Sequence, residues 1–95
     1  MKTLHNSDVS GASKNVSDLT VFGNGDMFQL LCKASSKAEG WMKSTKAMEI
    51  AGVGCVVQVT TQQGDNVSEA VTFVPNCVIK EELDNNGTVI GRKLV

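Results

Sequence analysis

Residues 54–75 read GCVVQVTTQQGDNVSEAVTFVP, and apolar and polar side chains alternate on both sides of a Gly-Asp-Asn segment. Alternation with a period of two, interrupted by such a segment, predicts two antiparallel strands joined by a tight turn. A three-residue loop at residues 64–66 would set Val59 opposite Val71, whereas a shift by one residue would set Val59 opposite Ala70. Because the first register shares more apolar area on one face, we expect the three-residue loop.

A second hairpin is predicted in residues 76–95, NCVIKEELDNNGTVIGRKLV. The dipeptide Asn86-Gly87 favours a type I′ turn, which sets Glu81 opposite Arg92 as an ion pair. The same register pairs apolar residues, Leu83 with Ile90 and Ile79 with Leu94. Charge pairing and apolar pairing therefore agree on one register.

The segment before these hairpins, DMFQLLCKASSKAEG at residues 26–40, is compatible with two structures. Asp26 as N-cap, Gln29 at the capping-box position and Gly40 as C-cap favour a helix around 26–39. The alternation of apolar and polar residues is also compatible with a strand, so that alternative stays open. Residues 18–25, DLTVFGNG, resemble a short strand that ends in a glycine turn.

Together these elements predict an α+β fold, with a small antiparallel sheet of four to five strands, two C-terminal hairpins and one helix around 26–39. An all-β meander or a small barrel is the alternative. We expect residues 1–18 to form a polar N-terminal arm and residues 19–95 to form a single globular domain, since the chain has 95 residues.

The composition restricts the partners of this domain. Hydrophobic residues make up 41% of the chain but aromatic residues only 4%, so its core must be small and aliphatic. A small core and the edge strands of a sheet that need covering predict a homo-oligomer. The net charge is −1 and basic residues form no run, so nucleic acid is not an expected partner. No apolar run has the roughly 20 residues of a membrane span, so no membrane association is expected.

The chain holds few of the residue types that catalysis and metal binding require. His5 is its only histidine, and Cys32, Cys55 and Cys77 are widely separated and lack a CxxC motif. We therefore expect no catalytic triad, metal site or cofactor, and we expect the protein not to be an enzyme. The three cysteines have apolar neighbours, which indicates reduced thiols that pack in the core of a cytosolic protein.

Two polar groups of residues are candidates for binding. The stretch EGWMKSTKAMEI, residues 39–50, places Trp41 near Lys43 and Lys46, although its alternation is also typical of an ordinary packing segment. A strand face with three polar side chains is the second candidate: Gln58, Thr60 and Gln62. That face is either simply solvated or a hydrogen-bonding platform for a partner.

The run GWMKSTKAMEIAGVGCVVQVTTQQGDNVSEAVTFVP, residues 40–75, resembles small proteins encoded by tailed bacteriophages and prophages. The resemblance implies a phage product in the cytoplasm of a host bacterium or in the virion, and it transfers no functional residues. We therefore expect a non-enzymatic binding protein that acts on a host factor or small ligand in the infected cell. The alternative is a virion structural or decoration protein that assembles as an oligomer.

Overall fold

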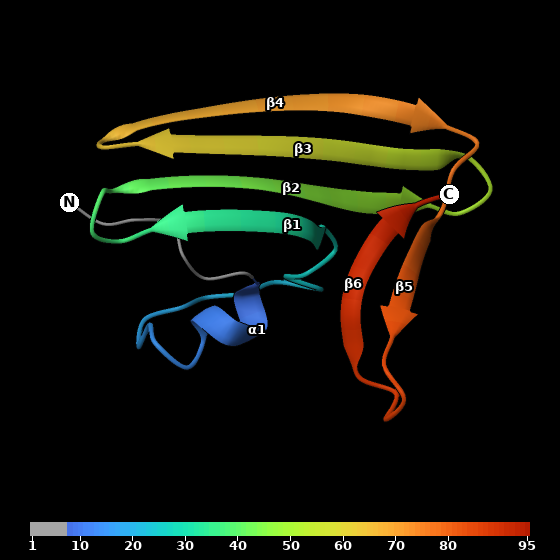
Figure 1. Ribbon diagram of the computed structural model, residues 1–95, viewed down its shortest axis with the longest axis horizontal. Coiled ribbons are helices and arrows are strands. Elements are labelled where there is room, and N and C mark those ends of the chain that lie inside the picture. The colour runs from blue at the N-terminus through green and yellow to red at the C-terminus, as the bar shows by residue number, and fades with distance from the viewer. Residues whose placement is uncertain (1–7) are drawn as a thin grey trace.

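The computed structural model describes residues 8–95 and consists mainly of antiparallel sheet (Figure 1). Four strands pair in the order β1-β2-β3-β4, namely β1 (Gln29–Ser36), β2 (Trp41–Ile50), β3 (Gly54–Gln63) and β4 (Asn66–Pro75). A separate two-stranded sheet contains β5 (Ile79–Leu83) and β6 (Val89–Leu94), and a short helix, α1 (Val9–Ala12), precedes the strands. The predicted class, α+β with a small antiparallel sheet and two C-terminal hairpins, is confirmed.

The position predicted for the helix is wrong, because β1 occupies residues 29–36 of the segment 26–39. The strand alternative for this segment is the structure observed. Gly40, expected to cap a helix, has a positive φ of 70° and belongs to the turn between β1 and β2. Its N–H donates to the carbonyl of Ser36 at 2.8 Å. Pairing with the long strand β2 outweighs the capping signals, since capping contributes only about 1 kcal/mol.

The N-terminal segment is attached to the sheet layer through Asp26. Its carboxylate accepts hydrogen bonds from the N–H of Val9 at 2.6 Å and from the hydroxyl of Ser10 at 2.8 Å. These bonds lower the pKa of Asp26 below its usual value, because they stabilise the charged form. Asp26 therefore holds the N-terminus of α1 rather than capping a helix of its own. The strand expected at residues 18–25 is absent from this described segment, and Phe22 there is fully exposed.

The register of the β3–β4 hairpin differs by one residue from the prediction. Val59 lies opposite Ala70, and the strands close on the pair Gln63 and Asn66, which leaves a two-residue loop. Gly64 has a φ of 60°, as the first central position of a type II′ turn requires. The predicted pairing of Val59 with Val71 is therefore wrong.

The β5–β6 hairpin keeps the predicted register over most of its length. Glu81 lies opposite Arg92, and Ile79 lies opposite Leu94, as predicted. An irregularity after Glu82 then sets Leu83 opposite Val89 instead of Ile90. The predicted type I′ turn is also wrong, because it needs a positive φ at both central residues and Asn86 does not have one.

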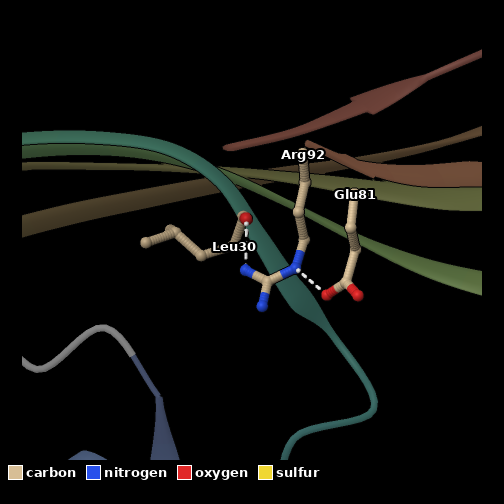
Figure 2. A network of polar contacts seen from close by, with 3 residues as sticks. All are labelled: Leu30, Glu81 and Arg92. Atoms are coloured by element: carbon tan, nitrogen blue, oxygen red, sulfur yellow. Dashed lines mark hydrogen bonds and ion pairs between the residues drawn. The ribbon is translucent and has the colours of Figure 1, made fainter. Parts of the chain in front are cut away.

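The β5–β6 hairpin is fastened to the larger sheet by side chains at its open end (Figure 2). Arg92 donates from Nη1 to the backbone carbonyl of Leu30 at 3.1 Å and from Nε to Glu81 Oε2 at 3.2 Å. On the other side, the N–H of Ile79 donates to Glu49 Oε1 at 2.8 Å. The hairpin therefore crosses the end of the sheet and contacts β1 and β2.

The hydrophobic core is small. Among the described residues, the buried hydrophobic side chains are Met42, Ala47 and Cys55. Cys55 is fully buried and Cys77 half-buried, and the Cys55 thiol donates to the Cys77 carbonyl at 3.5 Å. All three thiols are free, but the core position expected for Cys32 is wrong, because this residue is exposed.

Candidate functional site

The register of β2 and β3 sorts their side chains onto two faces. Residues directly opposite each other in an antiparallel pair project to the same face. One face, called the polar face below, carries five of the ten cross-strand pairs, and three of these hold its polar side chains: Met42 with Gln62, Ser44 with Thr60 and Lys46 with Gln58. The opposite face, called the Trp41 face, carries the other five: Trp41 with Gln63, Lys43 with Thr61, Thr45 with Val59, Ala47 with Val57 and Glu49 with Cys55.

The residues predicted as binding candidates therefore divide into two groups. Lys46, Gln58, Thr60 and Gln62 lie on the polar face. Trp41 and Lys43 lie on the opposite face, so the structure does not bring them together with the other four. The two lysines of the EGWMKSTKAMEI stretch separate because positions 43 and 46 differ in parity along a strand.

A cavity of about 210 Å³ opens on the polar face. It is lined by residues from all four strands of the sheet: Lys33, Met42, Ser44, Lys46, Gln58, Thr60 and Glu69. Ser44 and Thr60 are buried, with 7% and 9% of their surface exposed. The cavity thus combines hydroxyl, amide and charged groups above a largely buried floor.

Two lysines give this cavity its electrostatic character. Burial lowers the pKa of Lys33, and the nearby positive charge of Lys46 lowers it further. On the other side of the cavity, Glu69 Oε1 accepts a hydrogen bond from the Thr60 hydroxyl at 3.4 Å. A negatively charged group of a ligand placed near the lysines would relieve their mutual repulsion.

Lys33 and Glu69 belong to this cavity but were not among the predicted residues. Lys33 lies opposite Ser44, a position that becomes visible only when residues 29–36 are assigned as a strand. Glu69 lies opposite Thr60, and this pairing requires the observed two-residue loop. Finding both from the sequence would have required the β1–β2 register and the two-residue turn in addition to the alternation.

The Trp41 face has a shallower site. Trp41 is half-buried, and its indole N–H donates to Glu39 Oε1 at 3.4 Å. A cavity of about 390 Å³ beside it is lined by Ala34, Trp41, Lys43, Thr61, Gln62 and Gln63. Lys43 is exposed, and the neighbours Thr61 and Gln63 are polar. A ligand on this face would therefore contact the edge of the indole rather than enter an enclosed site.

A third cavity, of about 420 Å³, lies where the N-terminal segment, the sheet and the β5–β6 hairpin meet. Three carboxylates line it, and each already has a structural partner. Asp26 holds α1, Glu49 accepts from the backbone of Ile79, and Glu81 pairs with Arg92. This cavity is therefore a junction between parts of the fold, and it is a weaker candidate than the polar face.

Residues 8–95 contain no group of three His, Cys, Asp or Glu side chains arranged to hold a metal ion. His5 lies outside these residues. Across the same range, no helix is long and apolar enough to cross a membrane.

Comparison with known proteins gives a family assignment. A sequence model of the Lockin family matches residues 1–95. The chain belongs to the Lockin family. No curated protein matches this Lockin-family chain, and no solved structure matches it.

Proposed function

We propose that the chain is a small, non-enzymatic, phage-encoded binding protein that takes up a small polar ligand on the polar face of its sheet. The observation that carries this proposal is the cavity of about 210 Å³, in which buried hydroxyls lie beside Lys33 and Lys46. Ligand sites are concave and hold a few polar groups that orient the ligand. The protein would act in the cytoplasm of the infected bacterium.

The size and charge of the cavity restrict the ligand. Drug-sized ligands occupy about 300–1,000 Å³, so a cavity of about 210 Å³ accommodates a small molecule or one part of a larger one. The lysine pair favours a ligand with a negatively charged group, and Gln58 can accept or donate a hydrogen bond. A protein surface of a host factor could present such a group as well.

The test is to capture a ligand from bacterial cells. The purified chain is incubated with a small-molecule extract of the host, recovered and heat-denatured, and the released compounds are identified by mass spectrometry. We expect one anionic compound to be enriched at a stoichiometric level. The double variant Lys33→Gln/Lys46→Gln should release at least tenfold less of it.

Lys43→Gln provides the matched control, since it removes one lysine from the same strand as Lys46 but on the opposite face. It should release as much compound as the wild-type chain. Equal release from the double variant would contradict the polar face as the site. A stoichiometric host protein captured instead of a small molecule would identify a host factor as the partner.

A virion structural or decoration role is the second candidate. The small hydrophobic core and the many exposed apolar side chains favour this role, because assembly would bury apolar surface that the single chain leaves exposed. Mass spectrometry of purified particles discriminates the two roles, since a virion component would be present at high copy number. We also propose, for either role, that the chain is a homo-oligomer.

A further inference from the structure

The two edges of the four-stranded sheet differ in how they are protected. At the β1 edge, a bulge between Leu30 and Cys32 interrupts the strand. The Arg92 side chain also donates a hydrogen bond to the carbonyl of Leu30. At β4, ten consecutive residues form the edge, and all except Val74 are exposed. Within the described part of the chain, no segment lies beyond β4 (Figure 1). Long, uncovered edges of this kind pair readily with another strand.

The hydrogen-bonding groups on the open edge can be assigned from the hairpin geometry. In a two-residue hairpin, the closing residues Gln63 and Asn66 form a hydrogen-bonded pair, and such pairs recur at every second residue. The bond from Asn76 N to Val53 O at 2.9 Å continues this pattern past the end of β4. The backbone groups that point outward therefore belong to the odd-numbered residues of β4: Val67, Glu69, Val71 and Phe73.

The side chains of these outward residues are mainly apolar. Val67 is 50% exposed, Val71 is 62% exposed and Phe73 is 46% exposed. Glu69 is the one charged residue in β4, so the edge lacks the lysines that often prevent pairing. The edge thus presents free backbone groups and apolar side chains together.

We propose that β4 pairs antiparallel with β4 of a second copy of the chain, which joins two four-stranded sheets into one of eight strands. A two-fold axis at Ala70 would set Val67 opposite Phe73 and Glu69 opposite Val71 of the partner copy. This register avoids a direct contact between two Glu69 side chains, which would be destabilising. It also leaves Pro75, which has no N–H, outside the new hydrogen-bond ladder.

The surface of the chain is large enough to supply such an interface. The chain exposes 6766 Å², whereas a folded monomer of its mass exposes about 5,300 Å². Its radius of gyration is 14.5 Å, compared with about 12.4 Å for a compact domain of this length. The excess surface exceeds the roughly 800 Å² that each partner contributes to a standard interface.

This inference rests on the proposed homo-oligomer and names its interface, but it does not depend on the ligand. The cavity lies mainly on β1, β2 and β3, and edge pairing at β4 would leave it open on the same face of the joined sheet. A failure to capture a ligand would therefore not contradict the proposed β4 interface.

The first experiment blocks the edge with proline. In Val71→Pro the missing N–H is one that points away from β3, so the hairpin itself can keep its hydrogen bonds. We expect the wild-type chain to sediment as a dimer and the variant as a monomer with an unchanged far-UV circular dichroism spectrum. Ala70→Pro is the matched control: it removes an N–H that faces β3 and should abolish the sheet signal.

The second experiment tests the register and remains informative if Val71→Pro does not fold. At the two-fold axis, the two Ala70 residues would form a non-hydrogen-bonded pair with Cα atoms about 4.5 Å apart. This separation suits a disulfide. In a Cys32→Ser background, Ala70→Cys should therefore convert most of the chain to a disulfide-linked dimer on mild oxidation. Thr72→Cys, on the same side of the strand, would lie about 13 Å from its symmetry mate and should not cross-link.

The outcomes distinguish the proposed homo-oligomer from the proposed β4 interface. A monomeric wild-type chain at high concentration would overturn both the homo-oligomer and the β4 interface. A dimer that persists in folded Val71→Pro, or that gives no cross-link through Ala70→Cys, would overturn the β4 interface alone. Equal cross-linking of Ala70→Cys and Thr72→Cys would overturn the register.

Discussion

The β3–β4 hairpin has strands of ten residues and closes with the two-residue loop Gly64-Asp65, whereas the β5–β6 hairpin has short strands and a longer turn between Asp84 and Thr88. The first extends the main sheet, and the second packs across its end. In the long hairpin, a polar pair, Thr60 with Glu69, matches the observed register. In the short one, the ion pair of Arg92 with Glu81 does so.

The difference shows when apolar pairing predicts register and when it does not. A one-residue slip is costly only if one face of a strand is buried. Val59 and Val71 are 42% and 62% exposed, so the single chain gains little from pairing them. In β5–β6, apolar pairing and charge pairing favour the same register, and Arg92 of the ion pair also donates to the carbonyl of Leu30 in β1.

The largest expected effect is at the open end of the β3–β4 hairpin. A Cβ at Gly54 would collide with the backbone carbonyl of Val74, and its φ is 155°. Gly54→Ala should therefore lower the free energy of unfolding by about 3 kcal/mol or more, measured by urea denaturation. In Gly52→Ala, the control, no atom lies within 4 Å of the new Cβ, and its positive φ should cost about 1–2 kcal/mol. Equal losses would show that the contact with Val74 is unimportant.

The next effect concerns the attachment of the short hairpin. Arg92→Ala removes both the ion pair and the bond to the Leu30 carbonyl, and we expect a loss of about 1–2 kcal/mol, because the Arg92 side chain is only 28% exposed. Hydrogen exchange should quicken in β5 and β6 before it does in β3. Lys93→Ala, on an exposed neighbour in the same strand, should change neither quantity measurably. A uniform increase in exchange across all strands would contradict a separately attached hairpin.

The two turns can be compared directly through their glycines. Gly64 and Gly87 have φ values of 60° and 81°, so alanine at either position should cost about 1–2 kcal/mol of local strain. For Gly64→Ala the loss should appear in the global free energy of unfolding, because β3 is central to the main sheet. For Gly87→Ala it should appear as local opening of β5–β6 in hydrogen exchange. The reverse assignment would show that the short hairpin belongs to the cooperative core.

The smallest effect is a pH dependence at the connection between the hairpins. Burial raises the pKa of the Cys55 thiol from 9.0 to about 11, and its contact with Cys77 adds to the shift. The unfolded chain loses this proton first, so stability is complete below pH 9 and falls as the pH rises toward 11. Thermal unfolding of Cys55→Ala should lack this alkaline decline. Cys32→Ala, at the exposed cysteine, should retain it.

The sequence by itself determined the strand content from residue 54 onward and most of the β5–β6 register, because alternation and an opposite-charge pair are local signals. It also indicated the shared face of Gln58, Thr60 and Gln62, since parity along one strand does not depend on its neighbours. The packing role expected for residues 39–50 agrees with their position as the central strand β2, in which Met42 is buried.

Only the tertiary structure decided what residues 26–39 become, which face Trp41 and Lys43 occupy, and how β3 and β4 align. Residues 29–36 pair with β2 despite the helix-capping residues, and a two-residue turn replaces the loop that apolar pairing favoured. Trp41 and Lys43 share a face because residues 41–50 form a strand, in which every second side chain points to the same side. The cavity formed by Lys33, Ser44, Lys46, Thr60 and Glu69 joins four strands, so it exists only once all three of their registers are set. The physical reason is that a sheet with two exposed faces leaves apolar burial too weak to specify its own register.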